Sequence, residues 1–129
     1  MMASDNPDQL PSPRERREYY RVTVTLPIRI LRESDQMEGA FVEKSVNLSG
    51  GGIGVTITEV YQPSDVLVVT FRLPEHGLFN AFAEVLRLDH IPYPPRTYRL
   101  HARFIRMPAK DRDILVRHIT RFQRDHYSA

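Results

Sequence analysis

The most constraining feature of this sequence is a succession of short runs in which apolar and polar residues alternate. The clearest run covers residues 22–30, where every second side chain is apolar: Val22, Val24, Leu26, Ile28 and Ile30. Because successive side chains of a strand point to opposite faces, this alternation predicts a strand with one buried face. Pro27 falls on the opposite face, which predicts an edge or bulge position, since proline cannot donate to a strand ladder.

Five further runs of this kind follow, at residues 40–47, 53–57, 67–73, 79–89 and 97–106. Turn-forming residues separate most of them, at 50–52, 62–65, 74–77 and 91–95. Short strands punctuated by turns at this density are typical of antiparallel barrels, because closure removes exposed sheet edges. The sequence therefore predicts a mainly β fold, a six-stranded antiparallel β-barrel that is closed or nearly closed.

The periodicity changes after Pro108. Apolar residues now recur at helical spacing: Ile114, Leu115, Ile119 and Phe122. Acidic residues come early in this segment and arginines come late, an order that suits the helix dipole. We therefore expect a C-terminal α-helix over residues 108–126 whose apolar stripe packs on the barrel.

The length of 129 residues leaves room for one core and therefore one domain. Residues 1–13 are polar and rich in proline, which predicts a disordered leader before a domain at 14–129. Within that domain we expect an arginine-rich arm at 14–21, the barrel at 21–106 and then the helix. With no cysteine, disulfides and thiol nucleophiles are excluded. No apolar run is long enough to span a bilayer or resembles a signal peptide, so we expect a cytoplasmic protein.

Arginine supplies 16 of the 18 basic residues. Its planar fork of donors matches phosphate groups and guanine edges, although codon bias in a GC-rich genome would produce the same excess. One pair, Arg17-x-x-x-Arg21, lies where the predicted arm enters the first strand. The same spacing occurs at 99/103 and 117/121, which we interpret as solvated surface of a strand and a helix. Spacing alone therefore makes the pair at 17/21 a weak signal.

A second motif, Asn47-x-Ser49-x-x-Gly52, is far less expected by chance. With 11 Asp and Asn, 7 Ser and 6 Gly in the chain, random placement gives about 0.03 occurrences. Asn and Ser side chains can bond the backbone or a ligand, and glycine allows the main chain to approach closely. Successive N–H groups in such a turn can form an anion-binding nest. The alternative is a tight turn that only joins two strands.

Together the two motifs resemble the paired signature of the PilZ domain family, the cyclic di-GMP receptors of bacteria. That signature is RxxxR at the mouth of the first strand and [D/N]xSxxG about one hairpin later, and here 26 positions separate Arg21 from Asn47. The resemblance covers residues 14–126. It implies the same six-stranded barrel with a C-terminal helix.

The resemblance also implies a role for each motif residue. Arg17 and Arg21 would clasp guanine edges and phosphates of cyclic di-GMP. Asn47 and Ser49 would hydrogen-bond a guanine base or its phosphate side from the barrel wall. Gly52 would keep the wall clear of a side chain, so that the base can lie against it.

Arg16 stands directly before the first motif arginine. In PilZ-like proteins such an arginine tends to accompany binding of an intercalated cyclic di-GMP dimer, and a solvated extra charge is the alternative. The resemblance further implies that the ligand orders the arm and relays the signal to an effector protein that the sequence does not identify. The C-terminal helix offers a surface for that partner or for a second copy in a homodimer.

Other functions have less support in the sequence. The five histidines lack metal-ligand spacing, so we expect no metal cofactor. No catalytic motif is present, so we do not expect an enzyme. Two alternatives to the receptor remain open: a PilZ-fold protein-interaction adaptor without ligand binding, and a small β-barrel that binds nucleic acid. The second does not explain the spacing of Asn47, Ser49 and Gly52.

Overall fold

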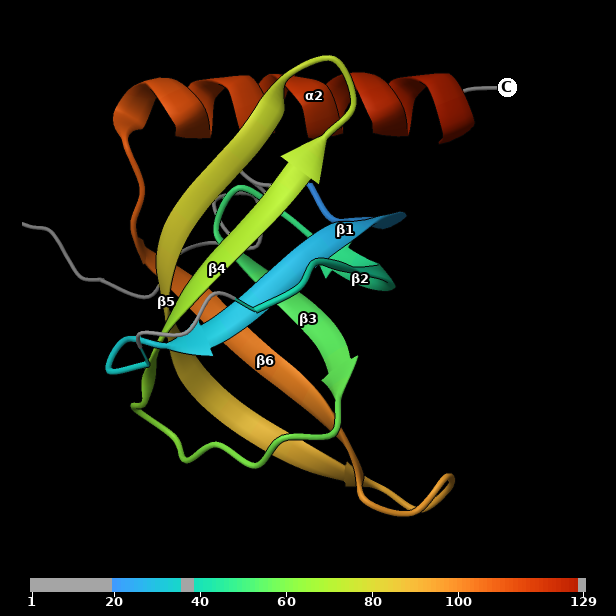
Figure 1. The fold of residues 1–129 in the computed structure, drawn as a ribbon. Helices are drawn as coiled ribbons and strands as arrows, with labels where there is room; N and C mark the ends of the chain where they lie inside the picture. The colour runs from blue at the N-terminus through green and yellow to red at the C-terminus, as the bar shows by residue number, and fades with distance from the viewer. Residues whose placement is uncertain (1–19, 36–38, 128–129) are drawn as a thin grey trace, which may run out of the picture.

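The six expected strands form one closed barrel in the computed structural model, which describes residues 20–35 and 39–127. The strands are β1 (Val22–Arg32), β2 (Val42–Leu48), β3 (Gly52–Ile57), β4 (Val66–Leu73), β5 (Gly77–Ile91) and β6 (Thr97–Arg106), followed by helix α2 (Ala109–Tyr127). Their order around the barrel is β1-β2-β3-β6-β5-β4, and every neighbouring pair is antiparallel. The predicted fold class is confirmed, and β5 is the strand that extends furthest beyond its predicted limits (Figure 1).

Strand β1 changes its pairing partners along its length. Residues 22–28 pair with β2, whereas pairing with β4 runs from Ile28 to Arg32. Pro27 therefore lies in the part of the strand that has a neighbour on one side. This is the local edge that its position in the alternation predicts, because proline has no N–H to give to a second ladder.

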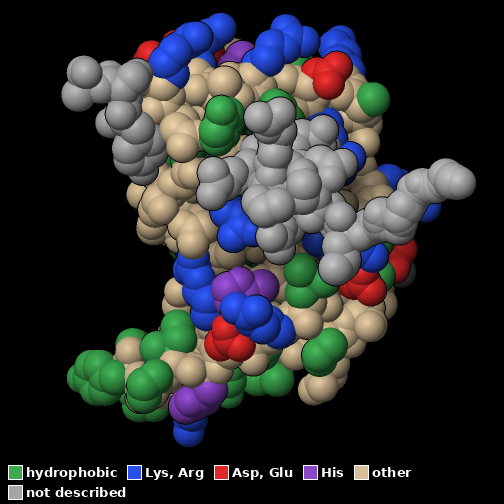
Figure 2. Space-filling view, turned by 180° about the vertical axis from the view of Figure 1, so that it is seen from behind, with side chains coloured by type: hydrophobic (Ala, Val, Ile, Leu, Met, Phe, Trp, Pro, Cys, Tyr) green, Lys and Arg blue, Asp and Glu red, His purple; other side chains and the backbone are tan. Residues whose placement is uncertain are grey.

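The inward-facing side chains of all six strands form one core. At its centre Phe71 stacks on Phe79, with ring centroids 5.6 Å apart, and on Phe104 at 6.3 Å. Helix α2 lies across one end of the barrel (Figure 1), and its Leu115 and Ile119 are fully buried in the same core. The apolar stripe predicted for the helix therefore packs on the barrel, while basic side chains gather on its outer surface at the top of Figure 2.

Strands β3 and β6 approach each other closely at Gly52. A Cβ atom on this residue would collide with the carbonyl oxygen of Ala102 and lie 3.2 Å from the Cα of Arg103. Both of these are backbone atoms of the neighbouring strand, so they cannot move aside without shifting the ladder. Gly54 points to the same face two residues later, but its nearest neighbour there is the flexible Arg99 side chain at 3.4 Å.

The turn between β4 and β5 contacts α2 through two histidines. The rings of His76 and His118 meet edge to face, with centroids 5.4 Å apart. Burial lowers the pKa of His118 below its ordinary value of 6.5, and the neighbouring His76 lowers it further. In the folded protein, His118 is therefore held towards its neutral form.

Within the described part of the chain, no helix is both long enough and apolar enough to cross a membrane.

Replacing Gly52 with alanine should lower the free energy of unfolding by about 2–3 kcal/mol, because the new methyl group would collide with the backbone of β6. Gly54→Ala is the matched control on the same strand and face, and it should cost less than about 1 kcal/mol because only a flexible side chain must move. Urea unfolding of both variants measures the difference. Equal costs would contradict the close approach described for β3 and β6.

Acidification should weaken the docking of α2. Because the pKa of His118 is lower in the folded state, the unfolded chain binds more protons as the pH falls below 6.5. The contribution of His118 to stability is thus fully present above pH 6.5 and is lost as the pH falls through the folded-state pKa. Thermal unfolding at several pH values should show this loss in the wild type and a smaller one in His118→Gln. The control His90→Gln, at an exposed position on β5, should keep the wild-type dependence.

Candidate functional site

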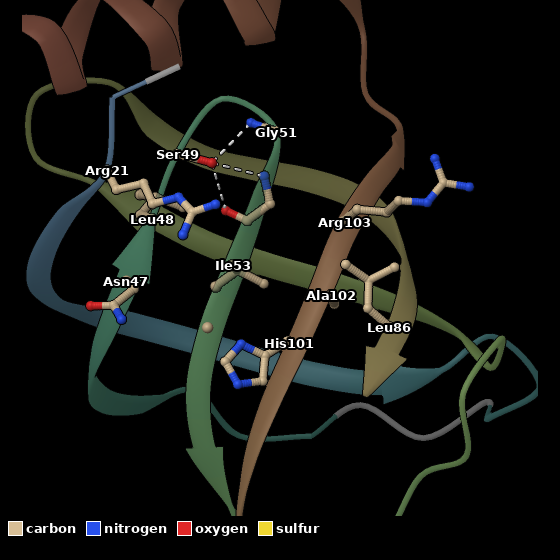
Figure 3. Close-up of a pocket in the computed structure, with 12 residues that line it drawn as sticks. Arg21, Asn47, Leu48, Ser49, Gly51, Ile53, Leu86, His101, Ala102 and Arg103 are labelled. Atoms are coloured by element: carbon tan, nitrogen blue, oxygen red, sulfur yellow. Dashed lines mark hydrogen bonds between the residues drawn. The ribbon is translucent and has the colours of Figure 1, made fainter. Parts of the chain in front are cut away.

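A cavity of about 330 Å³ opens on the outer face of the barrel beside the turn that joins β2 and β3. One side is built by Arg21, directly before β1, and by residues 47–49 of β2 and the turn. The middle is built by residues 51–54, and the far side by Leu86 of β5 with residues 101–103 of β6. Figure 3 shows these side chains around the turn.

Four of the residues predicted from the two motifs line this cavity: Arg21, Asn47, Ser49 and Gly52. Antiparallel pairing of β1 with β2 brings Arg21 close to the turn, since Val22 pairs with Leu48. In Figure 3 the Arg21 side chain extends towards Ser49. The other two predicted residues, Arg16 and Arg17, lie outside the described residues.

Ser49 organises the turn through its own hydroxyl group. Its Oγ accepts hydrogen bonds from the backbone N–H groups of Gly51 and Gly52, each at 3.1 Å. These two N–H groups therefore already have an acceptor in this arrangement, whereas in an anion-binding nest they would donate to the anion. The hydroxyl hydrogen makes only a long contact, 3.4 Å, to the Gly52 carbonyl oxygen, so it can turn to donate to a ligand.

The turn is also tied to the neighbouring strand. The backbone N–H of Ser49 donates to the carbonyl of Gly52 at 3.0 Å, and the N–H of Phe104 donates to the carbonyl of Gly51 at 2.9 Å. The first bond closes the turn, and the second holds it against β6. The cavity wall is consequently formed before any ligand arrives, which reduces the ordering cost of binding.

Asn47 is oriented by a neighbour on β1. Its Oδ1 accepts a hydrogen bond of 2.8 Å from the hydroxyl of Thr23, the residue that pairs with it across the two strands. With the oxygen held in this way, the amide NH₂ group points away from Thr23 and can donate to a ligand acceptor. Thr23 is therefore a supporting residue that the motif alone does not reveal.

Two glycines form a floor without side chains between the two walls. Gly52 and Gly54 occupy alternate positions of β3, and Asn47, Gly54 and His101 pair in one row across β2, β3 and β6. A flat ring can approach such a backbone surface closely. At Gly52, however, the collision with β6 already requires glycine. Packing against β6 is therefore sufficient to explain why this position is glycine, in addition to the role in ligand binding that the family resemblance implies.

The far wall was not predicted. From the sequence, Arg99 and Arg103 were interpreted as solvated surface residues. The Arg103 side chain is exposed, as expected, but it also lines the cavity opposite Arg21. Its Nε and Nη2 both contact Oε1 of Glu84, at 2.8 and 2.6 Å. The alternation of the sequence predicts only that Arg103 and His101 share one face of a strand. They reach the cavity because β6 pairs with β3, and no local sequence pattern predicts that pairing.

His101 belongs to a small charged cluster beside the cavity. Its Nε2 lies 3.1 Å from Oδ2 of Asp89, and the same oxygen accepts a bond of 3.0 Å from Nε of Arg87. The hydrogen bond from Arg87 is the main cause that lowers the pKa of Asp89, and the charge of His101 adds to it. The ionised carboxylate in turn orients the His101 ring at the cavity edge.

Comparison with known proteins places this geometry in a family. A sequence model of the PilZ domain matches residues 15–121, most of the chain. A search of curated protein sequences found no match. Among solved structures, the Bacillus subtilis inhibitor of motility (MotI/DgrA) is similar with a TM-score of 0.71 and 23% identity, over 91% of this chain and 58% of that one.

Two further structures have the same fold. A tetrameric PilZ domain protein of Xanthomonas campestris matches with a TM-score of 0.66 and 17% identity, over 84% of this chain and 90% of that one. YcgR of Escherichia coli, solved in complex with c-di-GMP, matches with a TM-score of 0.63 and 20% identity, over 86% and 47%. The chain thus spans little more than half of the Bacillus protein and about half of YcgR. With the paired motifs, the barrel topology and a family match over most of its length, the chain belongs to the PilZ domain family.

Proposed function

We propose that this protein is a receptor for the bacterial second messenger cyclic di-GMP, and not an enzyme. The observation that carries the proposal is that Arg21, Asn47, Ser49 and Gly52, from two separate motifs, line one cavity. The E. coli relative YcgR, solved in complex with c-di-GMP, supports the same ligand.

The chemistry of the cavity suits this ligand. A guanidinium fork can grip a phosphate or the O6 and N7 edge of guanine. The Asn47 amide and the Ser49 hydroxyl supply neutral donors, and the two glycines leave room for a planar base. The volume of about 330 Å³ lies within the usual range of ligand pockets.

The proposed switch is the arm at residues 14–21, which carries Arg16, Arg17 and Arg21. Binding of cyclic di-GMP would order this arm over the barrel, and the new surface would recruit or release an effector protein. Such a switch works only through a higher affinity of the ligand for the ordered state. In this proposal residues 1–13 are a leader, and the receptor acts in the cytoplasm.

Two relatives suggest what the output involves. The Bacillus relative is described as an inhibitor of motility, and the Xanthomonas relative as a tetramer assembled through a helical bundle. Motility is therefore one candidate process, and α2 is a candidate surface for a second copy or an effector.

Two alternative functions make different predictions. A PilZ-fold adaptor that binds no ligand would bind its effector protein equally well with and without cyclic di-GMP. A nucleic-acid-binding barrel would bind oligonucleotides that a micromolar cyclic dinucleotide does not displace.

Isothermal titration should show cyclic di-GMP binding with a dissociation constant of about 1 µM or tighter. Arg17→Ala and Arg21→Ala should each weaken it by at least about 100-fold, because each removes a bidentate charged contact. Their thermal unfolding should be unchanged, since Arg21 is exposed and outside the core.

Arg72→Ala, at an exposed position on β4 away from the cavity, is the matched control and should bind like the wild type. GTP and cyclic GMP serve as ligand controls. A folded wild-type protein that gives no heat with cyclic di-GMP would overturn the proposal.

The stoichiometry of the titration tests Arg16. We propose that the ligand is an intercalated cyclic di-GMP dimer, whose greater negative charge an added guanidinium stabilises. The wild type should then bind two ligands per chain, and Arg16→Ala should bind one. A stoichiometry of one in the wild type would contradict this.

A further inference from the structure

Strand β5 carries a bulge at Leu86. Along the β5–β6 ladder Val85 pairs with Ala102 and Arg87 pairs with His101, so that no residue of β6 is opposite Leu86. A bulge leaves one residue outside the ladder and redirects its side chain, and bulges are frequent beside functional sites. Here the Leu86 side chain lies on the far wall of the cavity, on the same side of β6 as Arg103 in Figure 3.

The Leu86 side chain adds an exposed apolar surface to a cavity that also offers polar groups. The residue is 52% exposed, on the outer face of a strand whose inward-facing Ala83 and Val85 are fully buried. The opposite wall offers polar groups from Arg21, Asn47 and Ser49, whereas the Leu48 side chain between them is buried in the core. A ligand that fills the cavity would therefore meet donors on one side and a hydrocarbon surface on the other, an arrangement that suits a purine ring with a polar edge and an apolar face.

Arg103 lies next to Leu86 and is held on the side away from the turn. Figure 3 shows its guanidinium extended away from Ser49, where its two bonds to Glu84 keep it. The Arg103 side chain is 57% exposed and that of Glu84 27% exposed. Ion pairs in such solvated positions contribute little net free energy, so the guanidinium can change partners cheaply. A phosphate group of a ligand could therefore take the place of the Glu84 carboxylate as the partner of Arg103.

We propose that the β5–β6 wall is a second half of the ligand site, distinct from the two motifs. Leu86 packs against a guanine base of the bound dinucleotide, and Arg103 exchanges Glu84 for a ligand phosphate. Glu84 thereby competes with the ligand and lowers its affinity. The inference rests on the proposed function, since it concerns the same ligand.

The apolar contact is tested by a matched pair of leucines on β5. Leu86→Ala should weaken cyclic di-GMP binding about fivefold in isothermal titration, since it removes apolar surface that the ligand buries. Leu78→Ala, at an equally exposed position (50%) that does not line the cavity, should bind like the wild type. Thermal unfolding of both variants checks that the fold is retained.

The charge exchange is tested by affinity and by its dependence on salt. Arg103→Ala should weaken binding about tenfold and make the affinity less sensitive to sodium chloride, because one cation–phosphate contact is lost. Glu84→Gln should tighten binding about threefold, because the competing carboxylate is gone. Leu86→Ala should leave the salt dependence unchanged, and Arg72→Ala should match the wild type in both measurements.

The outcomes separate this inference from the proposed function. If the wild type binds and both Leu86→Ala and Arg103→Ala bind equally well, the second half of the site is refuted and the receptor function stands. If Glu84→Gln weakens binding, the competition is refuted. If the folded wild type does not bind at all, the receptor function and this inference are both overturned.

Discussion

The close pairing of β3 with β6 is the interaction on which the candidate site depends. Gly52 lies so near the Ala102 carbonyl that no other residue fits without moving a strand, and Phe104 ties the adjacent turn to β6 through Gly51. This contact joins β1, β2 and β3 to β6, β5 and β4 in the barrel. It also places the motif turn of β2 and β3 beside His101 and Arg103, so one packing constraint serves both the fold and the cavity.

The cavity combines a rigid side with a side that can change partners. On the rigid side the Ser49 hydroxyl binds two backbone N–H groups and Thr23 holds the Asn47 amide, so both polar groups are positioned in advance. On the other side Arg103 is held by a solvated ion pair with Glu84. Positioned donors reduce the cost of binding, whereas a weakly held arginine can respond to a charged ligand.

Much of the fold was predictable because it depends on local periodicity. Alternation in residues 22–30 and helical spacing after Pro108 predicted β1 and α2, and turn residues predicted the breaks between strands. The limits of β5 were less predictable, since its ends extend past the apolar run into turn-like residues. An edge or bulge position was predictable for Pro27, because proline always lacks the N–H that a second neighbouring strand would need.

The sequence by itself determined the strands, the helix and four of the described residues that line the cavity, Arg21, Asn47, Ser49 and Gly52, because each depends on short spacings or rare local motifs. Only the tertiary structure decided what faces them. Leu86 reaches the cavity through a bulge in a ladder between β5 and β6, and Arg103 through the pairing of β6 with β3. Both are long-range contacts, and a strand's own residues do not specify which distant strand will pair with it or in which register.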